Sequence, residues 1–159
     1  MAAVQHCDES VSKERLRLWL RMLRLTRHME SRLRDRLRTE FDTTLPRFDV
    51  LSALDRNADG LLMSELSRVL IVSNGNVTGI VERLVTDGLV ERAAVPGDRR
   101  ASRVRLTRAG RTVFAEQAAR HEGWVDALLS ATTPEEAALL GTILRRQSRV
   151  LEEERVHDG

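Results

Sequence analysis

The sequence predicts a mainly α-helical fold with a small β wing, and three observations carry this prediction. Apolar residues recur every three or four positions in long stretches before residue 41 and after residue 107, as they do on amphipathic helices. Two shorter helical patterns lie close together between residues 64 and 86. Two strand-like segments, 89–94 and 103–107, follow them and are joined through a turn at Pro96-Gly97. Together these segments predict a winged helix-turn-helix between long flanking helices.

The first long helix is expected at residues 11–40, after a flexible leader at residues 1–10. A helix of this length cannot bury its apolar stripe alone, so it needs the C-terminal helices or another subunit as a partner. The stripe comprises Leu16, Trp19 or Leu20, Leu23, Thr26, Met29, Leu33 and Leu37.

The second helix is expected to begin near Pro46, because proline suits the first turn of a helix. Phe48, Leu51 and Leu54 share its inward face, and a turn at residues 57–60 closes it. A short apolar strand then leads into a third helix, for which Ser64 is the expected N-cap.

A tight turn at residues 71–73 separates the third helix from a fourth at residues 74–86. Gly88 is expected to end the fourth helix as its C′ residue. Both helices are amphipathic, with apolar faces formed by Leu66, Val69 and Leu70 in the third and by Val77, Ile80, Val81 and Leu84 in the fourth.

Small polar residues gather at the start of the fourth helix, where asparagine and glycine weaken helix stability. Such a helix start suits insertion into the major groove of DNA, because asparagine pairs with adenine edges and hydroxyl groups bond bases or phosphates. An exposed helix cap alone would also explain these residues. They are Ser73, Asn74, Gly75, Asn76, Thr78 and Gly79.

Arginines dominate the predicted hairpin. Asp98, Arg99 and Arg100 lie at its tip, and alternation puts Arg103 and Arg105 on one face of the returning strand. Arginines at such a tip can enter a minor groove or hold phosphates. An ordinary solvated basic turn is the alternative.

The C-terminal part is expected to form two helices suited to dimerisation. Thr107 can cap a helix from 108 to about 129, and residues 133–136 form a capping box with proline at the first helical position. Two reading helices, one from each subunit, favour a dimer over an intramolecular bundle. The last helix presents Leu139, Leu140, Ile143, Leu144, Val150 and Leu151.

Composition fits a single domain with uneven charge. The formal net charge is +2, but residues 13–40 hold ten basic and four acidic groups, and residues 73–111 hold eight arginines and four acids. The chain has no run of 18 apolar residues, so we expect no transmembrane helix. Acidic and basic residues interrupt the first 14 positions, so we expect no signal peptide. A single cysteine rules out an internal disulfide. We therefore expect a cytoplasmic protein with no membrane partner.

The helix-turn-helix and the wing contain a set of motifs, namely Glu65-Leu66, Val77-Thr78, Leu84, Gly88-Leu89-Val90, Asp98-Arg99-Arg100 and Leu106-Thr107-Arg108-Ala109-Gly110. Together these motifs resemble the MarR family of bacterial transcription regulators. The resemblance implies a homodimeric repressor that binds double-stranded DNA at a pseudo-palindrome and is released by a small ligand. It implies a helical dimerisation region at residues 11–44 and 108–155, and a DNA-binding winged helix-turn-helix at residues 45–107. Arg100 would enter the minor groove and Asp98 would orient the wing arginines. The predicted DNA contacts are Ser73, Asn74, Gly75, Asn76, Thr78, Arg83, Asp98, Arg99, Arg100 and Arg103.

Residues 32–49 and 72–79 are similar to the MarR subgroup that senses aromatic, hydroxycinnamoyl-type acyl-CoA thioesters. Such a ligand needs an apolar slot beside arginines that hold its phosphates. The alternatives are a free aromatic or phenolic acid as effector, and a solvated face for the arginines, paired with nearby acids. The expected effector contacts are Trp19, Met22, Met29, Arg32, Arg36, Arg38, Phe41, Arg47, Phe48 and Trp124.

Other functions fit the sequence less well. Cys7 has a neighbouring histidine, but the chain has no tyrosine to bond a reactive thiolate, which disfavours a redox switch. The four histidines show no ligand pair at helical spacing, so we expect no metal. No catalytic residue set or cofactor motif stands out, so we expect neither an enzyme nor a cofactor. A constitutive winged domain for DNA or protein contact remains as the alternative of a different class.

Overall fold

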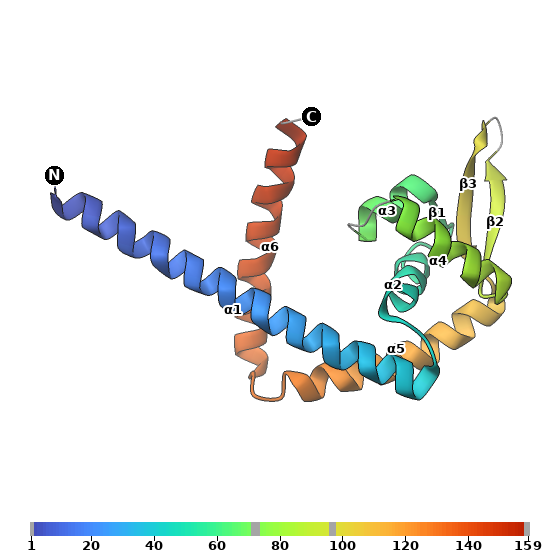
Figure 1. Cartoon of the computed structure of the whole chain (residues 1–159), viewed down its shortest axis with the longest axis horizontal. Helices are drawn as coiled ribbons and strands as arrows, with labels where there is room; N and C mark the ends of the chain where they lie inside the picture. The colour runs from blue at the N-terminus through green and yellow to red at the C-terminus, as the bar shows by residue number, and fades with distance from the viewer. Residues whose placement is uncertain (1, 71–73, 96–97, 158–159) are drawn as a thin grey trace. The chain divides into compact units, whose positions relative to one another are not determined.

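The computed structural model describes residues 2–70, 74–95 and 98–157, and for residues 2–10, 74–75, 95, 98–101 and 155–157 it describes the backbone only. The chain divides into two compact units, Met1–Trp124 and Val125–Gly159. The elements shown in Figure 1 are α1 (Ala2–Phe41), α2 (Leu45–Asp55), β1 (Leu61–Leu62), α3 (Met63–Leu70), α4 (Asn74–Thr86), β2 (Val90–Val95), β3 (Asp98–Leu106), α5 (Arg108–Leu128) and α6 (Pro134–His157).

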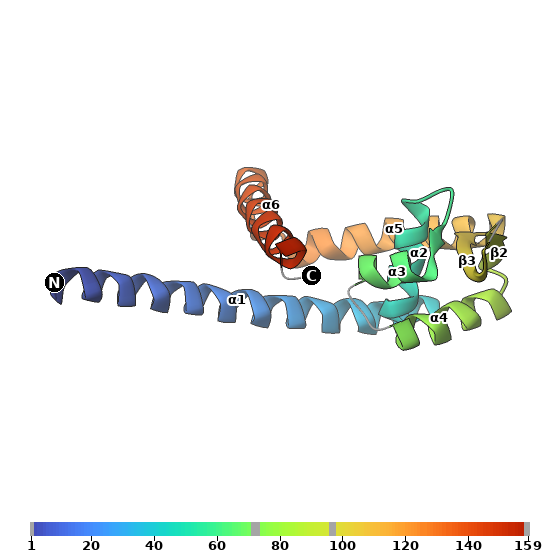
Figure 2. The same cartoon turned by 90° about the horizontal axis from the view of Figure 1, so that it is seen from above.

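The first helix is longer than its apolar pattern predicts. It begins at Ala2 instead of residue 11, so the predicted flexible leader is helical, and Figure 2 shows α1 as one continuous rod. No glycine or proline interrupts residues 2–10, so nothing local stops the helix there. Only the last part of the predicted stripe is buried in the single chain, at Leu33 and Leu37.

The second helix is confirmed. Pro46 lies in its first turn, and Phe48, Leu51 and Leu54 are buried along it. Asp42 has a positive φ between α1 and α2, which marks the break between the two helices.

The third helix corrects two predictions. It begins at Met63, and its start is tied by the Leu62 backbone N–H, which donates to Glu65 Oε2 at 2.7 Å. Ser64 is therefore inside the helix and is not its N-cap. Leu66 is buried as predicted, but Val69 is 50% exposed. The helix is only eight residues long, and only a narrow face of it packs against the core.

The fourth helix is confirmed at both ends. It runs from Asn74 to Thr86, and Val77, Val81 and Leu84 are fully buried along one face. Gly88 has a φ of 69°, and the Leu89 N–H donates to the Leu84 carbonyl at 2.9 Å. This is the bond pattern of a Schellman ending, which glycine adopts without steric cost.

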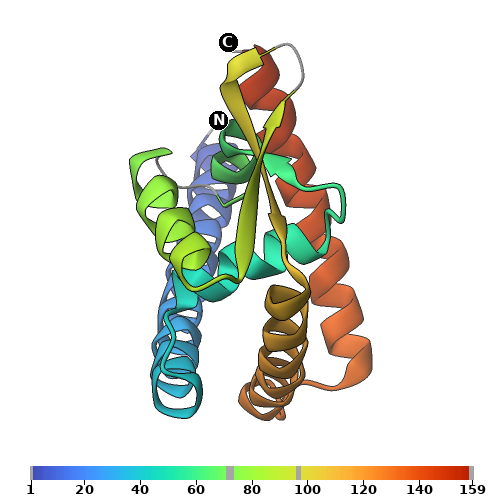
Figure 3. The ribbon, with the colours of Figure 1, turned by 90° about the vertical axis from the view of Figure 1, so that its right-hand side faces the viewer.

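The strands form an antiparallel sheet in the order β1-β3-β2, and Figure 3 shows the β2–β3 hairpin beside α4. Val104 and Leu106 are buried while Arg105 is exposed, which confirms the predicted alternation. β3 starts at Asp98, earlier than predicted, because its pairing with β2 continues to that residue. Asp98, Arg99 and Arg100 are therefore strand residues, while the turn at residues 96–97 lies outside the described part of the chain.

Both predicted C-terminal caps are present. Thr107 Oγ1 accepts from the Gly110 N–H at 3.0 Å at the start of α5. At the start of α6, the Glu136 N–H donates to Thr133 Oγ1 at 3.2 Å, and the Thr133 N–H donates to Glu136 Oε2 at 2.9 Å. This reciprocal pair is a complete capping box.

Candidate nucleic-acid interface and ligand region

The first half of α4 presents polar residues to solvent. Asn76 is exposed and Thr78 is half-buried, while Val77 between them is directed into the core. Asn74 and Gly75 begin the helix, and Ser73 lies outside the described residues. A helix start with free backbone N–H groups and a positive dipole end attracts phosphate. Arg83 is exposed two turns further along the helix.

The wing holds its described arginines in different ways. Arg103 is half-buried and donates from Nη1 to the Gly60 carbonyl at 2.7 Å, so it fastens β3 to the turn before β1. Arg105 Nε donates to Glu91 Oε1 at 2.6 Å across the β2–β3 pair. The backbone of Asp98, Arg99 and Arg100 continues β3 away from the core, and their side chains lie outside the described residues. The hydrogen bond from Arg103 to the Gly60 carbonyl is a contact that the sequence alone does not predict.

An aromatic cluster joins α1, α2 and α5. Phe48 stacks on His121, with ring centroids 4.5 Å apart and planes at 22°, and its centroid is 5.6 Å from that of Phe114. Trp124 lies 6.1 Å from Phe41 and 6.3 Å from His121. The predicted effector residues Phe41, Phe48 and Trp124 are therefore brought together, and their neighbour His121 was missed by sequence reasoning.

The sequence does carry a signal for His121. Phe114, His121 and Trp124 lie seven and three residues apart, which puts them on one face of α5. Gln117 lies on the same face and is buried, and its Oε1 has no hydrogen-bond partner among the described residues. Burial lowers the pKa of His121, which favours the neutral ring.

Charged residues surround the end of α1 next to this cluster. Glu40 accepts from Arg120 of α5 at 2.7 Å and from Arg36 at 3.2 Å. The hydrogen bond from Arg120 is the main cause that lowers the pKa of Glu40. Arg38 pairs with Asp35 at 3.3 Å, and Arg32 is exposed. Two of the predicted effector arginines are therefore already paired with acids on the same helix.

The other predicted effector residues lie apart from the aromatic cluster. Trp19 is 53% exposed, and Met22 and Met29 are half-buried, all on earlier turns of α1. Arg47 in the first turn of α2 donates from Nη2 to the carboxylate of Asp87, just after α4.

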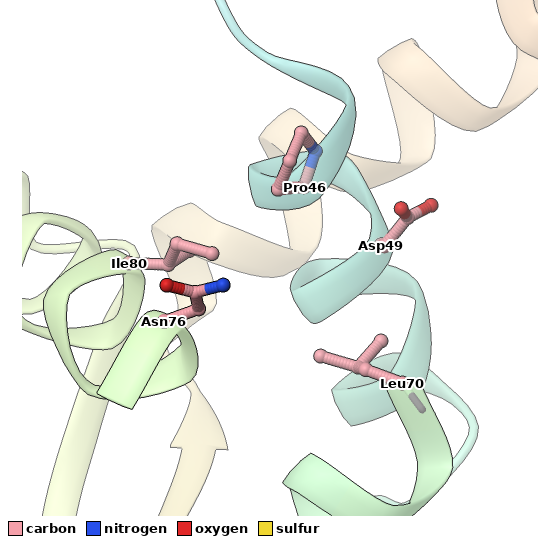
Figure 4. Close-up of a pocket in the computed structure, with 5 residues that line it drawn as sticks. All are labelled: Pro46, Asp49, Leu70, Asn76 and Ile80. Atoms are coloured by element: carbon pink, nitrogen blue, oxygen red, sulfur yellow. The ribbon is translucent and has the colours of Figure 1, made fainter. Parts of the chain in front are cut away.

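A cavity of about 310 Å³ lies between α2, α3 and α4. Figure 4 shows Asn76 and Ile80 projecting from α4 toward α2, with Leu70 of α3 at one end. Pro46 and Asp49 line the α2 side, and the carboxylate of Asp49 is turned away from α4. No local pattern in the sequence predicts this cavity, because its walls come from three separate helices.

Among the described residues, no group of three or more His, Cys, Asp or Glu side chains could hold a metal ion. None of the helices in the same part of the chain is long and apolar enough to cross a membrane. The side chain of Cys7 lies outside the described residues.

Comparison with known proteins connects this architecture to one family. The MarR family model matches residues 41–101. The multiple antibiotic resistance protein MarR of Salmonella typhimurium is 30% identical over 128 residues, which cover 79% of this chain and 88% of that protein. MarR of Escherichia coli K12 is 38% identical over 90 residues, or 54% of this chain and 62% of that protein. Three curated relatives are matched over only 42% to 62% of their own length.

A solved structure agrees over most of the chain. A mutant MarR from E. coli, crystallised in complex with operator DNA, superposes with a TM-score of 0.72 at 29% identity, covering 84% of this chain and 94% of that one. The winged helix-turn-helix fold is thus shared. On this sequence and structural agreement, the chain belongs to the MarR family.

Proposed function

We propose that the protein is a DNA-binding transcriptional repressor that acts in the cytoplasm as a homodimer. The observation that carries this proposal is α4, which buries Val77, Val81 and Leu84 and leaves Asn76 and Arg83 exposed beside a β2–β3 wing. A helix anchored in this way can enter the major groove while the wing contacts the adjacent backbone. The E. coli MarR relative in complex with operator DNA supports the same use of the fold.

Dimer formation is supported by apolar side chains that a single chain leaves in water. In α6, Leu139 is 61% exposed, and Leu140, Ile143 and Leu144 follow it on adjoining turns. In α1, Leu16, Trp19 and Leu20 are about half exposed. Helical surfaces of this kind associate with a partner to remove apolar area from water. Two subunits would supply two copies of α4, as a pseudo-palindromic site requires.

We propose an aromatic acyl-CoA thioester as the effector that releases the repressor. Support comes from the aromatic cluster of Phe41, Phe48 and Trp124, which adjoins the arginine-rich end of α1. The rings would suit the aryl group, and exposed guanidinium groups at Arg32, Arg36 and Arg38 would suit the phosphates of coenzyme A. Release requires the ligand to bind the DNA-free conformation more tightly than the DNA-bound one.

Electrophoretic mobility shift with the DNA upstream of the protein's own gene tests both parts. We expect the full chain to bind this DNA in preference to a scrambled duplex, and 4-hydroxycinnamoyl-CoA to release it. Equal affinity for the scrambled duplex would refute the repressor. Release by 4-hydroxycinnamic acid, without release by its CoA thioester, would refute the thioester and leave a free aromatic acid as effector. Coenzyme A alone is the control for the phosphates.

A further inference from the structure

The cavity between α2, α3 and α4 has the size and lining of a small-molecule site. Its volume of about 310 Å³ falls at the lower end of the range for ligand pockets, roughly 300–1,000 Å³. Leu70, Ile80 and Pro46 give it apolar walls, and Leu70 and Ile80 are only half-buried in the chain itself. An apolar group that filled the cavity would therefore remove additional surface from water.

Two polar side chains complete the lining, and both are free to bond a ligand. Asp49 is half-buried, and neither its carboxylate nor the amide of Asn76 forms a hydrogen bond or ion pair with any residue in the described part of the chain. Figure 4 shows the Asn76 amide directed toward α2, and the Asp49 carboxylate at the opposite edge, turned away from α4. A ligand in the cavity can thus meet the Asn76 amide directly, and it would reach the Asp49 carboxylate at the outer edge of the α2 side.

The carboxylate of Asp49 is partly buried and lies near one acid, Glu30, and one base, Arg56. Burial raises the pKa of Asp49, the charge of Glu30 on α1 raises it further, and Arg56 opposes both. Arg56 itself donates to the backbone carbonyl of Ser52 at 3.2 Å, so it is held on its own helix. A partly buried carboxylate without a partner destabilises the folded state, and a cation beside it would reverse that effect.

We propose that this cavity is a second ligand site, and that its ligand is a small organic cation with an apolar body. The apolar body would occupy the space between Leu70 and Ile80, and the cationic group would lie at the edge beside Asp49. The same carboxylate excludes anions, so this site selects the opposite charge from the effector region at the end of α1.

Occupancy of the site would affect DNA binding, and this consequence rests on the proposed function. Asn76 lines the cavity and is also one of the residues expected to read bases. A ligand that bonds Asn76 on the α2 side withdraws its amide from DNA. The cation would therefore weaken operator binding through α4 itself, independently of any aromatic effector.

Isothermal titration of the full chain without DNA tests the site, with phenethylamine as the probe cation. Its neutral and anionic counterparts, 2-phenylethanol and 3-phenylpropionate, have similar apolar bodies. We expect phenethylamine to bind and Asp49→Asn to weaken it on the order of tenfold, as the loss of a charge-assisted contact implies. Asp55→Asn, at an exposed position of the same helix, is the matched control and should leave binding unchanged.

A second variant tests the location. Ile80→Phe fills the cavity without a change of charge and should abolish phenethylamine binding, while circular dichroism confirms that the variant is folded. Absence of phenethylamine binding to the wild type, equal binding of 3-phenylpropionate, or unchanged binding by Asp49→Asn would each overturn the proposal. An electrophoretic mobility shift assay then separates the two proposals. If the chain binds phenethylamine but does not bind operator DNA, the cation site is supported and the proposed repressor function is refuted.

Discussion

The guanidinium of Arg47 in α2 donates a hydrogen bond to the carboxylate of Asp87, the residue that follows α4. These residues are 40 positions apart, and their side chains are 23% and 45% exposed. The pair connects the helix that carries Phe48 to the end of the proposed recognition helix. Arg47 Nε is buried and has no hydrogen-bond partner among the described residues.

The Arg47–Asp87 pair should contribute a modest coupling energy to folding. Arg47→Gln, Asp87→Asn and the double variant form a double-mutant cycle, measured by urea unfolding. We expect about 0.5–1 kcal/mol, because the pair is partly exposed. The Arg105–Glu91 pair has both side chains about half exposed and serves as the control, with a smaller expected value. A coupling energy at Arg47–Asp87 no larger than at the control pair would contradict this prediction.

Gly110 should tolerate no side chain. A Cβ at this position would lie 1.9 Å from the Leu89 carbonyl oxygen, which is fixed by a 3.1 Å hydrogen bond from the Thr107 N–H. Gly110→Ala is expected to destabilise the chain by about 2 kcal/mol or more, since the backbone has to move. Thermal unfolding measures the change.

Gly123 on the same helix provides the matched control. A Cβ there meets nothing within 4 Å, so Gly123→Ala should stabilise α5 by about 0.5–1 kcal/mol through helix propensity. Two alanine substitutions in one helix are thus expected to act in opposite directions. Equal effects would show that the close approach at Leu89 is not maintained.

Acid should destabilise the fold through His121. Burial lowers the pKa of His121 below its ordinary value of 6.5, so the unfolded chain binds this proton more readily than the folded chain. The contribution is complete above pH 6.5 and is lost as the pH falls through the folded pKa. His121→Phe retains a ring against Phe48 and should flatten the pH dependence of the melting temperature below pH 6.5. His28→Phe, at an exposed position of α1, is the matched substitution, and an identical change in both profiles would contradict the assignment.

The ionised carboxylate of Asp49 should lower the free energy of unfolding at neutral pH. Its folded pKa is raised, so its favourable contribution exists below the unfolded pKa and is lost as the pH rises through the folded value. Asp49→Asn is therefore expected to raise the melting temperature at pH 7 and to have less effect near pH 3. A lower melting temperature at pH 7 would show that the carboxylate has a stabilising partner.

Asn76 and Arg83 should affect DNA binding in different ways. Asn76→Ala is expected to relax base preference by about 1–3 kcal/mol at one position of each half-site, because a bidentate contact to a base edge is lost. Arg83→Ala should weaken binding to all sequences and reduce its salt dependence, as loss of a phosphate contact does. Fluorescence anisotropy at several salt concentrations measures both effects. Arg146 is an exposed arginine on α6, and Arg146→Ala controls for the change in net charge. An equal loss of DNA affinity in Arg146→Ala would contradict a phosphate contact by Arg83.

Several elements could be predicted from the sequence because short-range bonds define them. The caps at Thr107 and Thr133 and the end of α4 at Gly88 each depend on partners within five residues. The alternation of Arg105 with Val104 and Leu106 likewise follows from strand geometry alone. At these positions, hydrogen bonds to nearby residues favour one backbone conformation. The sequence pattern therefore predicts the structure correctly.

Contacts between distant segments were decided only by the tertiary structure. Pairing with β2 extends β3 to Asp98, and packing of α5 against α2 places His121 on Phe48. The ion pair of Arg47 with Asp87 and the cavity beside Asp49 depend on how α2, α3 and α4 pack, which no local pattern encodes. The sequence by itself determined the winged helix-turn-helix and its capped helices. The tertiary structure alone decided which arginines form ion pairs and where a cavity is open to a ligand. Both depend on packing between residues far apart in the chain, because the free energy of the whole fold determines that packing.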